Sequence, residues 1–280
     1  MGDFKVNEEW FESVVQFSNE AGGTDTVDLP GGHGTVDAGF FYRTAEQMRG
    51  YMDPDDENGT VYGYSWPDNL APAGWYCYNE PETEEDPQIM FCMNDFPVPY
   101  GTGFIIDAAD YEGAPQLVFS GEVAKEDKEI PLTLEVYNWT GNCMPVNLTM
   151  GDLIKNDDFL ESVVQFTALE GGTAKVELPG GYGSVDAGFF YRSAEQMYSY
   201  MDPEDENGLV YGYSWPDNLP PSGWYCYNEP ETEEDPQVMF CMNDYAIPAG
   251  HAFCVDAADY EGEPTITIPS PLVDHSKSAE

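Results

Sequence analysis

Two acidic stretches carry the residue types best suited to binding a ligand. DPDDENG at 53–59 recurs as DPEDENG at 202–208, and each places carboxylates at alternating positions before a glycine. This resembles the first half of an EF-hand calcium loop, although Tyr64 and Tyr213 stand where the bidentate glutamate belongs. The pattern predicts either a Ca²⁺ loop of another kind or an acidic hairpin turn. The candidate calcium ligands are Asp53, Asp55, Glu57, Asp202, Glu204 and Glu206.

Aromatic residues form a second group that can bind a ligand. They alternate along two expected strands of each half of the chain, so that rings share one face of a strand. Exposed rings stack on sugars, which makes glycan binding one interpretation, whereas a core filled by aromatic side chains is the other. The candidate glycan-binding residues are Trp66, Trp75, Tyr76, Trp215, Trp224 and Tyr225.

The sequence gives less support for a catalytic site than for a ligand-binding site. Ser65 and Ser214 lie in GYSWP rather than in G-x-S-x-G, and no base is near them in the sequence. The histidines, at 33, 251 and 275, do not recur between the two halves, so a histidine-dependent mechanism would not operate in both. With 53 acidic residues, carboxylate pairs are too common to indicate a glycosidase. We therefore expect no enzymatic activity, with a hydrolase as the alternative.

The six cysteines suggest three disulfides. Two cysteines flank the acidic loop YNEPETEEDPQ in each half, where a hairpin would bring them opposite each other, and a crosslink over a loop of ~15 residues is worth about 3 kcal/mol. Buried thiols are the alternative. The second half has two further cysteines that the first half lacks, which predicts a third bridge and an extracellular or cell-surface location. The expected pairs are Cys77–Cys92, Cys226–Cys241 and Cys143–Cys254.

The elements that hold these residues are duplicated. Residues 1–119 recur at 150–268 with one fixed offset of 149 and without insertions, and GWYCYNEPETEEDPQ at 74–88 is unchanged at 223–237. A fixed offset over this length indicates one folding unit present twice rather than a solenoid of short repeats. Residues 120–149 have no counterpart. We expect two domains, 1–125 and 126–280, with a linking strand at 129–149 that opens the second domain.

The amino-acid composition limits the classes of partner that the protein can bind. The 280 residues include 53 Asp and Glu against 9 Lys and Arg, which gives a formal charge of −44. Such a charge repels nucleic acids and anionic membranes. Hydrophobic residues make up 41% and aromatic residues 14% of the chain. A chain of this composition is expected to fold, with the acidic residues on its surface. No apolar run approaches the ~18 residues of a membrane span, and we expect no membrane insertion.

Short β-branched and aromatic runs separated by Gly, Pro, Asn and Asp predict an all-β fold with two tandem, jelly-roll-like β-sandwich domains. One short helix is expected after Thr44, with Gln47 completing a capping box. Glu129–Tyr137 is expected as a strand. The expected strands of the first half are Ser13–Phe17, Thr26–Leu29, Gly39–Tyr42, Thr60–Trp66, Gly74–Tyr78, Ile89–Met93, Gly103–Asp107 and Gln116–Phe119.

The stretch VYNWTGNCMPVNLTMGD at 136–152, followed by GYSWPDN and GWYCYNE, resembles β-rich repeat modules of secreted or surface proteins in bacteria. The resemblance implies a structural or adhesive role. We therefore expect an extracellular structural or surface-assembly protein that self-associates. If 129–149 belongs to the second domain, the first lacks that strand, and the tail at 264–280 of a neighbouring molecule is a candidate donor. The alternatives are that the first domain closes without this strand, or that a native strand upstream of Met1 has been removed. A glycan-binding, adhesin-like module, dependent on calcium in one version, is the alternative.

Overall fold

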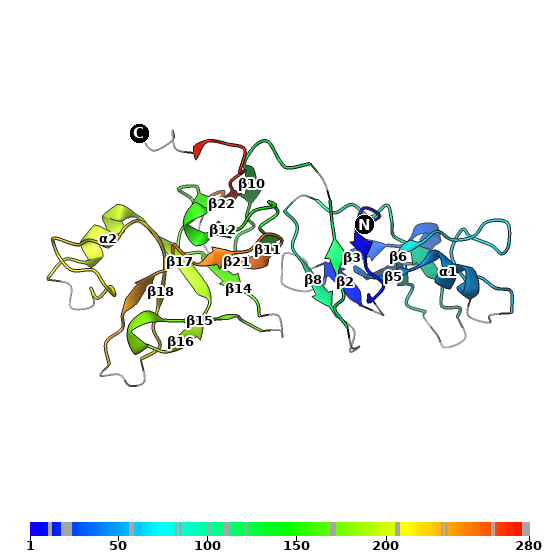
Figure 1. The fold of residues 1–280 in the computed structure, drawn as a ribbon, viewed down its shortest axis with the longest axis horizontal. Helices are drawn as coiled ribbons and strands as arrows, with labels where there is room; N and C mark the ends of the chain where they lie inside the picture. Colours follow the sequence, from blue (N-terminus) through cyan, green and yellow to red (C-terminus); the bar gives the residue numbers. More distant parts are fainter. Residues whose placement is uncertain are drawn as a thin grey trace. The chain divides into compact units, whose positions relative to one another are not determined.

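The chain folds into two compact units, unit 1 (Met1–Glu122) and unit 2 (Val123–Glu280) (Figure 1). The computed structural model describes residues 1–10, 13–17, 24–55, 59–81, 83, 86–99, 101–108, 113–120, 122–168, 172–204, 208–230, 232, 235–258 and 261–275. Antiparallel strands dominate both units, and the described part of the chain holds two short α-helices, so the all-β prediction is confirmed. None of the described helices is long and apolar enough to cross a membrane.

Unit 1 is built around a five-stranded antiparallel sheet in the order β7-β6-β5-β2-β8. Two small two-stranded sheets flank it: β1 pairs with β9, and β3 pairs with β4. A 3₁₀ turn, η1 (Pro30–Gly32), joins β3 to β4. The strands are β1 (Lys5–Val6), β2 (Val14–Phe17), β3 (Thr26–Asp28), β4 (Thr35–Asp37), β5 (Gly39–Arg43), β6 (Gly74–Tyr78), β7 (Met90–Cys92), β8 (Phe104–Asp107) and β9 (Leu117–Val118).

Unit 2 repeats this plan and adds strands to it. Its main sheet has six strands in the order β11-β21-β14-β17-β18-β19, and a second sheet has the order β10-β22-β13. The pairs β12–β20 and β15–β16 complete it, with 3₁₀ turns η2 (Met150–Asp152) and η3 (Pro179–Gly181). The strands are β10 (Lys128–Pro131), β11 (Tyr137–Gly141), β12 (Leu148–Thr149), β13 (Ile154–Lys155), β14 (Val163–Phe166), β15 (Lys175–Glu177), β16 (Ser184–Asp186), β17 (Gly188–Arg192), β18 (Gly223–Tyr227), β19 (Met239–Cys241), β20 (Ala246–Ile247), β21 (Ala252–Asp256) and β22 (Thr265–Ile268).

The predicted helix is present as α1 (Ala45–Tyr51). The Gln47 amide donates to Thr44 Oγ1 over 3.2 Å, and the Thr44 amide donates to Gln47 Oε1 over 2.8 Å. These two bonds form the expected capping box, which satisfies two amides that a helix N-terminus leaves without an intrahelical partner. Helix α2 (Ala194–Tyr200) begins in the same way, with Ser193 in place of the threonine.

Two expected strands differ in the structure. Residues 60–66 form turns held by isolated bridges rather than a strand, because Gly63 takes a left-handed conformation with φ of 76° and ends the extended run. The expected strand Glu129–Tyr137 is divided between β10 and β11. Glu135 lies in the loop between them with φ of 61°, a conformation incompatible with a continuous strand.

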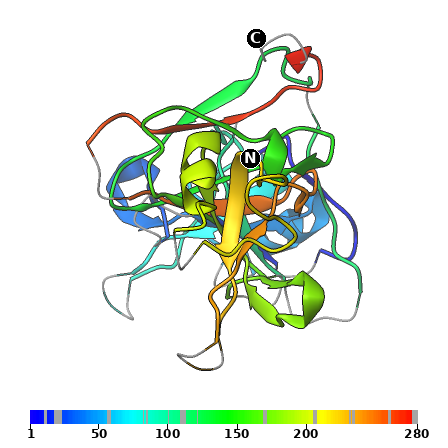
Figure 2. The same ribbon diagram turned by 90° about the vertical axis from the view of Figure 1, so that its left-hand side faces the viewer.

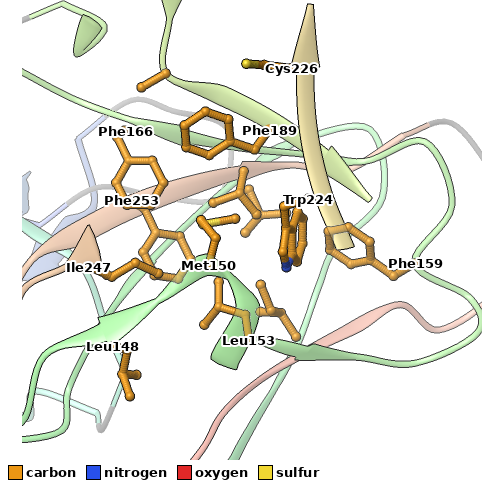
Figure 3. Packing of buried hydrophobic residues seen from close by; sticks show 14 of the residues in the cluster. Leu148, Met150, Leu153, Phe159, Phe166, Phe189, Trp224, Cys226, Ile247 and Phe253 are labelled. Atoms are coloured by element: carbon orange, nitrogen blue, oxygen red, sulfur yellow. The ribbon is translucent and has the colours of Figure 1, made fainter. Parts of the chain in front are cut away.

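Side chains pack on both faces of each main sheet. In β6, Trp75 and Cys77 enter one buried cluster and Tyr76 enters another, as the alternation of strand side chains requires. Trp224 of unit 2 packs edge-on against Phe159, with ring centroids 5.6 Å apart (Figure 3). The two cores fix the positions of the outer strands of each main sheet. The candidate functional site lies along the outer edge of these strands.

Candidate functional site

The expected calcium ligands do not gather in the described structure. Asp53 Oδ1 accepts the Asp55 amide over 3.0 Å, and Asp202 Oδ1 accepts the Glu204 amide over the same distance. Both carboxylates therefore stabilise local turns. Glu57 and Glu206 lie outside the described residues. Among the residues that are described, no three His, Cys, Asp or Glu side chains form a possible metal site, and calcium binding stays a prediction from the sequence.

Most of the expected glycan-binding aromatics lie in the core. Trp75, Tyr76, Trp224 and Tyr225 are buried, so the core interpretation is correct for these four. Trp66 is 39% exposed. Trp215 is half-buried and meets Tyr198, with ring centroids 4.9 Å apart. A sugar can reach Trp66 and Trp215 but not the four core rings.

The two hairpin disulfides are absent because the strand register differs from the expected one by a single residue. Cys92 lies opposite Tyr76, and Cys77 lies opposite Phe91. Because successive side chains point to opposite faces of a sheet, a shift of one residue places the two thiols on opposite faces. Cys226 and Cys241 are separated in the same way, with Cys241 opposite Tyr225.

The third expected disulfide is also absent, so none of the six cysteines, all of which are described, forms a bridge. Cys254 lies on β21 opposite Trp139, whereas Cys143 follows the end of β11. Phe253 and Val255 point into the large core of unit 2, against which Cys143 packs, and Cys254 between them points to the other face. The disulfide argument for an extracellular location therefore does not hold.

We predict that three thiols are unreactive in the folded protein. Burial raises the pKa of Cys77, Cys226 and Cys254 to about 12, with the Asp256 carboxylate adding to the effect at Cys254. Near pH 8 these groups stay protonated and are poor nucleophiles. A thiol-specific reagent should spare them in buffer and titrate all six cysteines in denaturant without reductant. Fewer than six thiols in denaturant would show a disulfide and contradict the structure.

Residues 123–149, called the linking segment below, contribute three strands to unit 2. β10 pairs with β22, β11 with β21, and β12 with β20, all antiparallel. Figure 2 shows β10, in green, beside the red β22. The segment thus covers three strands of the repeated unit at once.

The C-terminal tail is occupied within unit 2. β22 lies between β10 and β13, so both of its edges are paired. Beyond it, the Ser270 amide donates to Asp127 Oδ1 over 2.8 Å, and the Ser270 hydroxyl donates to Ala124 O over 2.6 Å. The expectation that this tail is donated to a neighbouring molecule is therefore wrong, because its strand holds the linking segment in place.

Two buried asparagines fasten the linking segment to unit 2. Asn142 Nδ2 donates to Ile247 O over 2.9 Å and to Val146 O over 2.8 Å, and its Oδ1 accepts the Met144 amide. Asn138 Nδ2 donates to Val255 O over 3.3 Å and to Thr133 O over 2.9 Å. Three apolar side chains of the segment enter the large core, namely Leu132, Met144 and Leu148 (Leu148 is labelled in Figure 3).

The same edge is open in unit 1. β8 is the last strand of its sheet, and no described strand pairs with its outer side, whereas β11 covers the equivalent β21. Ile106 is 43% exposed and its counterpart Val255 is 0% exposed; Phe119 is 51% exposed and its counterpart Ile268 is 0% exposed. Ile105 is likewise exposed where Cys254 is buried. Unit 1 therefore presents, uncovered, the surface that the linking segment covers in unit 2.

No family model matches the chain, and no curated protein or solved structure matches it. The functional argument therefore rests on the geometry of the two units, and the resemblance to bacterial surface modules stays a hypothesis. The linking segment has one signal in the sequence: residues 120–149 lie between the repeated ranges 1–119 and 150–268 and match neither.

Proposed function

We propose that the protein is a structural assembly protein, built from two tandem β-sandwich units, whose unit 1 receives a β-strand from another chain. The main observation behind this proposal is the difference between the two copies of one edge: β11 pairs with the outer edge of β21, whereas no described strand pairs with the outer edge of β8. An open edge presents a row of backbone donors and acceptors that recruits further strands.

The open edge lacks the features that normally prevent such pairing. Natural edge strands are protected by lysine, proline or inward-pointing charges. Phe104, Ile105 and Ile106 carry none of these, and Asp107 at the end is the strand's one charged residue. Exposed Val118 and Phe119 add apolar surface on the neighbouring β9 region. These features support a surface that is covered in the working assembly.

In a pure sample the available strand belongs to a second copy, so we predict concentration-dependent self-association through β8. Sedimentation velocity from low micromolar to about 100 µM should show it, and Ile105→Lys should shift the protein to monomer at all these concentrations. Leu209→Lys is the matched control, because Leu209 is also 46% exposed but lies outside the strands.

The dependence of self-association on salt concentration is an independent test. Each copy carries a formal charge of −44, so two copies repel each other at low ionic strength. Screening at about 0.5 M salt should therefore strengthen the self-association. A wild-type chain that stays monomeric at every concentration and salt level would refute assembly through this edge.

Glycan binding is a second candidate, favoured by exposed aromatics that recur in both units. Tyr62 and Tyr211 are each 39% exposed, as is Trp66. Sugar rings stack on such surfaces. A glycan array on the wild type and on the double variant Trp66→Ala/Trp215→Ala tests it: binding that the variant loses would support this function.

A further inference from the structure

We infer that the strand received by unit 1 has the chemistry of the linking segment. The ligand is an extended segment with two asparagines four positions apart, as at Asn138 and Asn142, and with apolar residues that enter a sandwich core, as Leu132, Met144 and Leu148 do. This inference rests on the proposed function and identifies the partner of the same edge.

The acceptor surfaces of the two units are almost the same. β2 and β14 both read VVQF, and the residues equivalent to β8 in unit 2 read FCVD instead of FIID. The pairing register also matches, with Val15 opposite Ile106 and Val164 opposite Val255. A strand that fits one edge therefore meets the same spacing of backbone donors and acceptors on the other.

The carbonyl groups that accept hydrogen bonds from the two asparagines also have sequence counterparts in unit 1. In unit 2 the two asparagines donate to the carbonyl groups of Val255 and Ile247. With the offset of 149 these positions are Ile106 and Val98 in unit 1. The backbone also agrees at the start of each repeat, where Met150 N donates to Tyr245 O over 2.9 Å and Met1 N donates to Phe96 O over 2.7 Å. An asparagine-bearing strand thus meets the carbonyl of Ile106 on β8, whereas Val98 lies outside the strands of unit 1 and would have to pair as β20 does in unit 2.

Unit 1 lacks the apolar side chains that the linking segment contributes to the core of unit 2. Leu132, Met144 and Leu148 share one buried cluster with Val255 and Ile268. The side chains at the matching positions of unit 1, Ile106 and Phe119, are exposed. A bound segment of this type would remove them from water, and burial of apolar area is the main driving force for strand addition with side-chain insertion.

The donor is not the linking segment of the same molecule, because that segment is already in use. Its withdrawal would unpair β20 and leave one edge each of β21 and β22 without a partner. It would also expose Val255 and Ile268. Moving the segment to unit 1 would therefore cover the outer edge of β8 and uncover the outer edge of β21. The number of covered edges rises only when a further segment of this type supplies the strand.

A labelled peptide of residues 126–149, carrying Cys143→Ser, tests the inference against the full-length chain. We expect saturable binding of one peptide per chain by fluorescence anisotropy, and slowed amide exchange in residues 104–107 with exchange in 252–256 unchanged. Ile105→Lys should weaken binding by about tenfold or more, a loss of ~1.4 kcal/mol, while Leu209→Lys should leave it unchanged. A peptide with Asn142→Ala should also bind more weakly, which separates this docking from unspecific edge pairing.

The outcomes separate the inference from the proposed function. Binding that protects residues 104–107 and is lost in Ile105→Lys supports the inference. Self-association that Ile105→Lys abolishes, without any peptide binding, leaves the proposed function intact and overturns the inference, because β8 then pairs with β8 of a second copy. Absence of both self-association and peptide binding overturns both.

Discussion

Replacing Trp224 with alanine is expected to lower the free energy of unfolding of unit 2 by about 3–5 kcal/mol. Trp224 is 1% exposed and lies in the large core, in edge-on contact with Phe159 (Figure 3). Its ring also meets that of Tyr191 edge-on. Its removal leaves a cavity that β17 and β18 cannot fill, because each of these strands is paired with a neighbour on both sides. Urea denaturation followed by amide exchange in residues 123–275 measures the loss.

The duplicated chain supplies its own controls for this experiment. Trp75 is the counterpart in unit 1, and Trp75→Ala should destabilise unit 1 while leaving the exchange of unit 2 unchanged. Trp215→Ala removes the same side chain from a half-buried site and should lower the free energy of unfolding by only about 1 kcal/mol. Equal losses for Trp215→Ala and Trp224→Ala would contradict the assignment of Trp224 to the core.

Local signals in the sequence predict much of the fold. Thr44 and Gln47 identify the start of α1, because both capping bonds form between residues three apart. Gly74–Tyr78 is predicted with its observed bounds, since Gly and Asn flank an aromatic run. Such features depend on neighbours in the chain and need no knowledge of the tertiary structure.

Strand register is where prediction from the sequence fails. Cys77 and Cys92 are roughly equidistant from the middle of the acidic loop, which suggests that the two cysteines face each other, yet the observed register differs by one residue. Register follows from which side chains the two packed faces bury, and here Cys77 joins Phe91 in one cluster while Tyr76 and Met90 join the other. That choice depends on residues far away in sequence.

The open edge illustrates the same limit. Residues 120–149 match neither repeat, but the sequence does not reveal which strands they pair with. The tail at 265–268 alternates as a donated strand should, and it is instead the acceptor between β10 and β13. Alternation identifies a strand and leaves its partner undetermined.

Replacing Gly141 with alanine is expected to loosen the linking segment and lower the free energy of unfolding of unit 2 by about 1–3 kcal/mol. A Cβ at this position would lie 2.8 Å from His251 O and 2.9 Å from Ala252 Cα, both of which belong to the backbone around β21. Backbone atoms cannot rotate aside as a flexible side chain can, so β11 must move away from β21. Urea denaturation and amide exchange in residues 252–256 report the loss.

Gly188→Ala is the matched control, because it makes the same change in another strand of the same sheet. A Cβ at Gly188 meets Val163 Cγ1 at 3.5 Å, an ordinary contact, so the stability should stay the same or rise by about 0.4–1 kcal/mol. A Gly141→Ala protein as stable as the Gly188→Ala protein would show that β11 does not pack closely on β21.

Gly141→Ala should also change the assembly. A β11 that separates from β21 leaves unit 2 with an open edge like that of unit 1, so one chain then presents two such edges. Two edges per chain allow growth beyond a dimer, because each added copy brings a further free edge. We therefore expect larger oligomers from Gly141→Ala than from the wild type in sedimentation velocity, and a second Ile105→Lys change should limit them again. Oligomers of unchanged size, from a protein whose residues 252–256 do exchange faster, would mean that an exposed edge of this unit is insufficient to recruit another chain.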